Sequence, residues 1–377
     1  MIIGIDGNEA NIDNRVGVNV YAYQILKALH KNLQKNNVND KLIVYLKNEP
    51  SSDLPKEDKY LQYRVLRGKS LWIIRKLTPE ITKKGREFDV FFSPNHYTPI
   101  LSRCPLVCSV MDLDYLNNSR QFKSKDFWQL KLWSAYSMLL STNIIAISES
   151  TKKQIVRHYP FASDKVVVTP LAHDNNVFNI NISRNDVRPI VNKYSITSKY
   201  VLFLSTLKPS KNIEGLLTAW SRVGRASNGF KLVIAGKKGW LFESIFEKVK
   251  KLKLEGNVVF TDFVLEADKP LLIKGAYAFI LPSFWEGFGL DPLNAMAVGV
   301  PVVVSRVGSL PEVVGDAGIY IDPNNIDSIV QGLTKVLSMG KVDYNKQVAK
   351  GLIQASKFSW DKTAEQTLDV LRQASNK

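Results

Sequence analysis

The feature that most constrains the fold of this chain is a repeated alternation of short apolar runs with longer amphipathic segments. Residues 18–29 and 213–220 have the apolar spacing of helices. The apolar runs lie at residues 2–5, 42–46, 90–92, 106–110 and 144–147, and again at 200–204, 232–235, 258–260, 278–281 and 300–304. Short apolar runs that alternate with helices are typical of parallel strands covered on both faces.

We therefore predict an α/β protein with two Rossmann-like, doubly wound domains facing across a cleft. A chain of 377 residues is long enough for two cores of ordinary size. The polar stretch 179–198 indicates the connection, so we place one domain at residues 1–180 and the other at 195–357. Ligands of such sheets bind beyond the carboxyl ends of the strands, where the site is expected.

The chain is basic, with 51 Lys and Arg against 35 Asp and Glu. No helix-turn-helix, RNP or zinc-finger pattern accompanies this charge, so nucleic acid is not an expected partner. Residues 64–86 concentrate cations around Leu71, Trp72, Ile73 and Ile74. Such a segment could hold an anionic membrane surface or form a solvated helix face, and both interpretations stay open.

The two cysteines, Cys104 and Cys108, support neither a disulfide framework nor a zinc site. The N-terminus lacks the pattern of a signal peptide, and no apolar window is long enough for a spanning helix. We expect a cytoplasmic protein, and the membrane interpretation of residues 64–86 would make it peripheral at the inner face of a membrane.

Residues 281–323 carry the strongest indication of a binding site. Gly287 and Gly289 allow the backbone to approach a ligand, and a helix that opens near Pro292 directs its N-terminus at this loop. Glu286 is suited to accept hydrogen bonds from sugar hydroxyls. A phosphate site beside a sugar site indicates a nucleotide sugar; the alternative is an ordinary glycine turn before a helix.

This segment resembles the signature of the GT-B glycosyltransferases of family 4, also called glycosyltransferase group 1. Other stretches agree in order along essentially the whole chain. They are Gly4-Ile5-Asp6 with residues 15–21, Ile145 to Ser150, Val168 to Leu171, Leu204 to Asn212, Val233 to Gly236, and Phe358-Ser359-Trp360. The resemblance also implies that a last helix, residues 360–377, completes the first domain.

The resemblance implies a retaining transfer of a hexose from a UDP-, GDP- or ADP-sugar to a glycan or lipid-linked acceptor, without metal or cofactor. Glu286 would contact the donor sugar, and Lys211 would neutralise the leaving diphosphate. The remaining donor-binding candidates are Gly17, Lys208, Ser210, Phe288, Gly289, Leu290 and Asn294.

Three positions depart from the family pattern. Ser210 stands where the family has an arginine, Asn294 where it has a second glutamate, and Met111 where it commonly has a histidine. Lys208 and His96 could compensate. Because one sequence does not show whether the changes are tolerated, the alternative is a catalytically weak binding or scaffold protein.

Asp112 is expected to line the acceptor side of the cleft as a catalytic residue, or simply to cap the following turn. Asp112-Leu113-Asp114 also spells a metal-binding pattern, but the family binds diphosphate in the other domain, so no metal is expected. Structural roles are favoured for His173, for the pair Lys237 and Lys238, and for Glu312. A dehydrogenase is disfavoured because the glycine fingerprint is missing.

Overall fold

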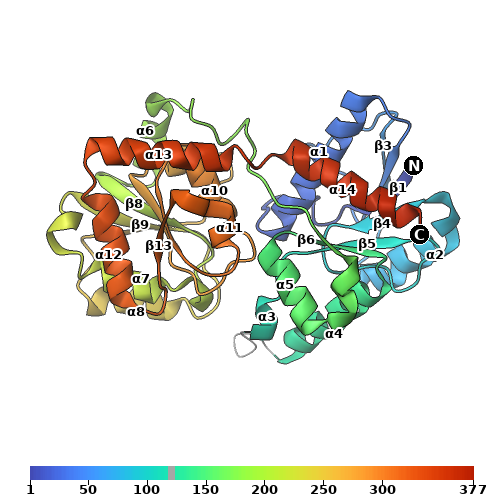
Figure 1. Cartoon of the computed structure of the whole chain (residues 1–377), viewed down its shortest axis with the longest axis horizontal. Coiled ribbons are helices and arrows are strands. Elements are labelled where there is room, and N and C mark those ends of the chain that lie inside the picture. Colours follow the sequence, from blue (N-terminus) through green and yellow to red (C-terminus); the bar gives the residue numbers. More distant parts are fainter. Residues whose placement is uncertain (118–123) are drawn as a thin grey trace. The chain divides into compact units, whose positions relative to one another are not determined.

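The computed structural model describes residues 1–117 and 124–377, which form two compact units. Unit 1 consists of Met1–Leu171 and Trp360–Lys377, and unit 2 of Ala172–Ser359. The chain thus returns to unit 1 with its final helix (Figure 1). Unit 2 begins at Ala172, before the polar stretch 179–198 that the sequence analysis took as the connection between the domains.

Unit 1 is built on a parallel sheet of seven strands among the described residues, in the order β3-β2-β1-β4-β5-β6-β7. The order reverses direction between β1 and β4, as in a Rossmann fold. The strands are β1 (Ile2–Asp6), β2 (Lys41–Leu46), β3 (Leu61–Val65), β4 (Val90–Ser93), β5 (Leu106–Val110), β6 (Asn143–Ala146) and β7 (Val166–Val168).

Helices cover both faces of this sheet, as alternate residues of β5 show. Cys108 and Val110 belong to a core that includes Met138 of a covering helix, whereas Ser109 on the opposite face meets Tyr21, with 2.8 Å between the two hydroxyl oxygens. The described helices of unit 1 are α1 (Val18–Asn36), α2 (Thr78–Lys84), α3 (Asp114–Asn117), α4 (Ser124–Leu140), α5 (Glu149–His158) and α14 (Trp360–Ser375).

Helix α14 is anchored in unit 1. Trp360 packs against Tyr21 of α1, with ring centroids 6.3 Å apart, and Thr363 Oγ1 donates to the carbonyl of Pro170 at 2.7 Å. Leu368 and Leu371 lie in the core. Without this helix, apolar surface of unit 1 would be exposed to water.

Unit 2 repeats the design with six described parallel strands in the order β10-β9-β8-β11-β12-β13. Its strands are β8 (Lys199–Leu204), β9 (Phe230–Ala235), β10 (Val258–Asp262), β11 (Ala278–Leu281), β12 (Val302–Ser305) and β13 (Gly318–Ile321). Its described helices are α6 (Arg184–Lys193), α7 (Ile213–Trp220), α8 (Glu243–Lys251), α9 (Lys269–Gly275), α10 (Leu290–Ala297), α11 (Leu310–Val314), α12 (Ile326–Leu337) and α13 (Lys341–Ala355). The strand order again reverses between its third and fourth positions, at β8 and β11.

The basic segment 64–86 differs from its prediction in one respect. Trp72, the expected aromatic anchor for a membrane, is buried, and its Nε1 donates to the carbonyl of Leu66 at 2.5 Å. It packs in a core with Leu77 and Ile81. The segment therefore presents its charges but not its tryptophan.

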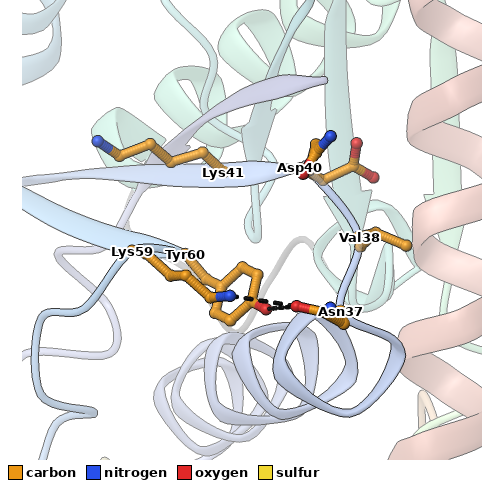
Figure 2. Close-up of a pocket in the computed structure, with 7 residues that line it drawn as sticks. Asn37, Val38, Asp40, Lys41, Lys59 and Tyr60 are labelled. Carbon is orange, nitrogen blue, oxygen red and sulfur yellow. Dashed lines mark hydrogen bonds between the residues drawn. The ribbon is translucent and has the colours of Figure 1, made fainter.

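A pocket in unit 1 lies where α1 ends and β2 begins (Figure 2). Asn37 Oδ1 accepts hydrogen bonds there from Lys59 Nζ at 3.1 Å and from the Tyr60 hydroxyl at 2.7 Å. This pocket lies at the amino ends of the strands, the edge opposite to that where parallel sheets bind ligands. Searched over the described residues, the helices include no apolar stretch that could cross a membrane.

Candidate functional site

The candidate site of unit 2 lies where its strand order reverses. Lys211 ends the short turn that follows β8, and Glu286 lies in the loop that follows β11. Because β8 and β11 are hydrogen-bonded neighbours, their carboxyl ends deliver these loops to the same edge of the sheet. In a doubly wound sheet this is the point at which a ligand is bound.

Lys211 and Glu286 meet in a close ion pair. Lys211 Nζ donates to Glu286 Oε1 at 2.6 Å, and the hydroxyl of Ser283 donates to the same oxygen at 2.7 Å. Each side chain of the pair keeps 13% of its surface exposed. The cation and the carboxylate are thus held in place yet remain accessible to a ligand.

A second glycine turn fixes the backbone of Glu286. Gly308 adopts a φ of 54°, and a Cβ atom there would lie 2.3 Å from the carbonyl oxygen of Glu286. The hydroxyl of the next residue, Ser309, lies 3.0 Å from that oxygen and 2.7 Å from the carbonyl oxygen of Phe288. The loop that carries Glu286 is therefore braced by the loop after β12.

Helix α10 begins directly after this loop. Gly289 precedes it with a φ of 102°, which turns the chain so that the first amide groups of the helix point back toward the loop. Such amides and the positive end of the helix dipole favour an anion. Phe288 is buried and packs edge-on against Phe358, with ring centroids 5.9 Å apart. It anchors the loop, while Leu290 is the first residue of the helix.

Asn212 explains how Lys211 is positioned, and the sequence analysis did not single it out for this. Its φ of 54° is a left-handed conformation that asparagine tolerates better than most residues. Its buried Nδ2 donates to the carbonyl of Pro323, in the loop after β13, at 2.7 Å. The residue next to Lys211 thus ties the loop after β8 to the loop after β13.

Ser210, which replaces the family's arginine, is buried. Its carbonyl accepts a hydrogen bond from the amide of Phe284 at 2.9 Å, which joins the loops after β8 and β11. Lys208 lies with its Nζ 5.1 Å from the ring centroid of Trp240. The structure thus gives Ser210 a bracing contact and places Lys208 beside an aromatic ring.

Asp291 is a charged group of this site that the sequence analysis missed. It occupies the first turn of α10, three residues before the partly exposed Asn294, so both lie on one side of the helix. Burial raises the pKa of Asp291 to about 6, and the nearby Lys269 opposes this effect. The signal available in the sequence was a carboxylate at a helix start directly after a glycine loop.

The weaker candidates of unit 2 have structural surroundings. Lys238 pairs with Asp262 at 3.5 Å, and Lys237 accepts a hydrogen bond from the amide of Leu207 with its carbonyl. Glu312 lies in the first turn of α11, where its charge suits the helix dipole. His173 is buried, which lowers its pKa.

The predicted residues of unit 1 lie at the carboxyl ends of its strands. Gly17 precedes α1 with a φ of 53°, and a Cβ atom there would meet nothing within 4 Å. Asp112 is exposed, and its Oδ1 accepts a hydrogen bond from the amide of Asp114 at 3.0 Å. That contact is the turn-capping interaction raised as the alternative to a catalytic role.

Two further residues of unit 1 were considered because the family's usual histidine is absent: Met111 takes its position, and His96 was the suggested substitute. Met111 is partly exposed, and its carbonyl accepts a hydrogen bond from Thr151 Oγ1 at 3.2 Å. His96 lies against Tyr97, with ring centroids 4.1 Å apart and ring planes tilted by 52°, and burial lowers the pKa of His96 to about 4. His96 is therefore neutral at physiological pH, and a role in ligand binding stays a prediction.

Across residues 1–117 and 124–377, no group of three or more His, Cys, Asp or Glu side chains is arranged to hold a metal ion. Cys104 and Cys108 are free and buried.

Two doubly wound parallel-sheet units, the second with a lysine–carboxylate pair beside a helix start at its strand reversal, have the architecture of GT-B glycosyltransferases. Comparison with known families agrees. Residues 16–176 match the family described as Glycosyltransferase Family 4, and residues 187–355 match the Glycosyl transferases group 1 family. The chain therefore belongs to the family 4, or group 1, glycosyltransferases, and the predictions of family and of two Rossmann-like domains are confirmed.

Individual relatives support this assignment. The chain is 33% identical over 289 residues to the O-antigen chain mannosyltransferase B of Escherichia coli, an alignment that covers 75% of this chain and 74% of that protein. Among solved structures it is similar to sucrose-phosphate synthase from Thermosynechococcus elongatus (TM-score 0.76, 16% identity, 99% and 98% coverage). It is equally similar to Anabaena HepE in complex with UDP and glucose (TM-score 0.76, 17% identity, 98% and 99% coverage). These structures share its fold.

Proposed function

We propose that this protein transfers mannose from a nucleoside diphosphate mannose to a growing glycan or lipid-linked acceptor, with retention of the anomeric configuration. The mannosyl group is inferred from the similarity to the O-antigen mannosyltransferase. The base is one of uracil, guanine and adenine. The observation that carries the proposal is the pair of Lys211 Nζ and Glu286 Oε1, 2.6 Å apart at the strand reversal of unit 2.

Each partner of this pair has a separate task. The Lys211 ammonium would neutralise the negative charge that grows on the leaving diphosphate, and stabilisation of developing charge is usually a large catalytic term. Both described side-chain hydrogen bonds to Glu286 fall on Oε1, so Oε2 is the atom assigned to a sugar hydroxyl. The amides of Gly289 and Leu290, at the start of α10, would hold the diphosphate or the sugar.

The reaction exchanges one bond of the anomeric carbon for another on the same face of the sugar. The bond from C1 to the phosphate oxygen breaks, the bond from C1 to the acceptor oxygen forms, and the acceptor proton passes to the leaving phosphate. Charge neutralisation by Lys211 makes a metal ion unnecessary in this scheme. Gly17 would contact the donor, and Asp112 would orient the acceptor while it caps the turn.

The departures from the family pattern can be accommodated in the same site. Lys208 would supply the second positive charge that Ser210 lacks. Asn294 would bond the ribose diol as a neutral acceptor, and Asp291, one turn earlier on the same helix, adds a carboxylate beside it. In this proposal the donor site is altered in composition but retained.

The test is a transfer assay with UDP-, GDP- and ADP-mannose and the corresponding glucose donors, offered with lipid-linked mannosyl oligosaccharides in EDTA. We expect transfer from one mannose donor, without metal, and an α-linked product from an α-linked donor. Lys211→Ala should lower kcat by about 10²-fold or more. Lys238→Ala, which removes an exposed lysine with a surface partner, should change it less than twofold.

A binding or scaffold role is the alternative. It predicts that the folded protein binds glycan acceptors but transfers no sugar from any of these donors. We propose that the protein works in the cytoplasm at the inner face of a membrane, where lipid-linked acceptors are found.

A further inference from the structure

Helix α4 of unit 1 presents an apolar face to solvent. Trp128, Leu132, Tyr136 and Leu139 are 52%, 63%, 40% and 54% exposed. Their spacing of three and four residues places them along one side of the helix. The opposite side supplies the buried Met138 to the core. A helix that is apolar on both sides is expected to be covered on both, and in unit 1 only one side is covered.

Neighbouring segments extend this face on both flanks of α4. The hydroxyl of Tyr136 donates to the carbonyl of Ile100 at 3.3 Å, which brings the exposed Leu101 alongside. On the other flank Lys165 Nζ donates to the carbonyl of Leu139 at 3.0 Å, in the segment that carries the exposed Phe161. We call these side chains the α4 patch: Leu101, Phe161, Trp128, Leu132, Tyr136 and Leu139.

Cations surround the α4 patch. Lys131 lies with its Nζ 5.0 Å from the ring centroid of Trp128, and Lys125 is exposed one turn earlier. Arg103 is exposed beside Leu101, and Lys165 borders the other flank. The acidic neighbour on that flank is the exposed Asp164. Positive groups therefore outnumber negative ones among the described side chains at its rim.

We propose that the α4 patch docks on an anionic lipid surface. Tryptophan and tyrosine favour the boundary between lipid headgroups and acyl chains, and lysine stems can lie along apolar surface with the ammonium at the headgroups. A rim of cations is complementary to acidic lipids. A second copy of this chain fits less well, because self-association would bring Lys131 and Lys165 near their own counterparts.

This inference rests on the membrane location proposed above but not on the proposed reaction, and it places the anchor at α4, while a role for residues 64–86 stays a prediction. The segment 64–86 keeps its charges at the surface, but its Trp72 lies in the core. The aromatic anchor comes instead from Trp128. Sequence reasoning missed α4 because its apolar residues occur on all sides, the pattern of a buried helix.

The test is flotation of the full chain with vesicles of phosphatidylcholine alone or with 30% phosphatidylglycerol. We expect binding to the anionic vesicles that weakens in high salt. The variant Leu132→Ser/Leu139→Ser should reduce the bound fraction at least tenfold. The matched control is Val342→Ser/Ile353→Ser, which changes residues of α13 that are 67% and 65% exposed, and should bind as the unmodified protein does.

Further readouts separate the alternatives. Nucleotide binding and melting temperature should be unchanged in Leu132→Ser/Leu139→Ser, which excludes misfolding as the cause. Arg75→Ala/Lys76→Ala, in the segment 64–86, should retain more than half of the binding. The proposal is overturned if the unmodified protein binds no vesicles, if only the Arg75/Lys76 variant loses binding, or if the α4 substitutions abolish a dimer in sedimentation instead.

Discussion

At the scale of single residues, the site depends on backbone conformations that only certain residues allow. Gly308 combines a left-handed φ of 54° with a Cβ position 2.3 Å from the carbonyl of Glu286. Gly224 has a similar φ of 64°, but a Cβ atom there would meet nothing within 4 Å. An alanine at Gly224 would therefore introduce backbone strain alone, whereas an alanine at Gly308 would introduce both strain and a steric collision.

We predict that Gly308→Ala destabilises the protein by about 3 kcal/mol or more, because strain and collision add. Gly224→Ala introduces backbone strain alone and should lower the free energy of unfolding by about 1 kcal/mol. Urea unfolding checks both values. Equal losses in the two variants would show that the loop of Glu286 is free to move away, against the bracing described for it.

Asp291 gives a prediction on pH. Its pKa is raised from 3.8 to about 6 in the folded protein, so the folded state holds the proton more tightly than the unfolded chain. Stability from this group is therefore present below about pH 4 and is lost as the pH rises through about 6. Asp291→Asn should match the unmodified protein at pH 4 and exceed it by about 2 kcal/mol at pH 7. Chemical denaturation at both pH values measures the difference.

A constant difference between the two proteins across this range would contradict the burial of Asp291. The comparison is insensitive to Asp6, whose pKa burial also raises to about 6, because both proteins contain it. An unfavourable ionised carboxylate at this position is consistent with a binding role, since binding sites retain such groups at a cost in stability.

At the scale of elements, the turn before α7 connects fold and function. Asn212 supplies a left-handed residue at its start and a buried hydrogen bond to Pro323. Asn212→Gly removes the hydrogen bond but still allows the left-handed backbone conformation. Asn212→Ala removes the hydrogen bond and also disfavours that conformation. The two substitutions thus separate the contributions of this residue to the position of Lys211.

We expect Asn212→Gly to lower the free energy of unfolding by about 1–2 kcal/mol, and Asn212→Ala to lower it by about 1 kcal/mol more. Nucleotide affinity should fall in the same order, because Lys211 precedes this residue directly. Thermal unfolding and nucleotide titration of both variants are the measurements. If affinity stays constant while stability falls, Asn212 supports the fold without positioning Lys211.

The elements themselves were largely predictable. Residues 213–220 and 278–281 coincide with α7 and β11 because a strong apolar period and flanking turns leave little ambiguity. Strand β13 was missed because glycine and tyrosine interrupt its short apolar run, and α4 because periodicity cannot reveal a helix that is apolar all round. For the site, motif residues were predictable, whereas the role of Asn212 depends on its contact with Pro323, 111 residues away.

At the scale of the whole molecule, each unit has its own core, and α14 belongs to the first of them. Leu371 of α14 and Leu333 of α12 are both fully buried, one in each unit. Replacement of either by alanine should cost about 2–5 kcal/mol. The two variants therefore weaken the units separately while they leave the residues of the donor site intact.

Calorimetry of these variants tests where the donor binds. Leu333→Ala should lower the transition temperature of unit 2, and Leu371→Ala that of unit 1. We predict that a bound nucleotide raises the transition temperature of unit 2 more than that of unit 1, because a ligand stabilises the unit that binds it. Stabilisation confined to the transition affected by Leu371→Ala would place the nucleotide in unit 1 and refute the donor site proposed here.

The central claim is that Lys211 and Glu286 form the donor site, and isothermal titration with UDP, GDP, ADP and their mannose conjugates tests it most directly. We predict that one nucleotide binds, that Lys211→Ala weakens it by about 10- to 100-fold, and that Lys238→Ala does not. Glu286→Gln should keep nucleotide affinity and lose only the contribution of the sugar. Absence of binding at millimolar nucleotide, or equal affinity in Lys211→Ala, would contradict the account.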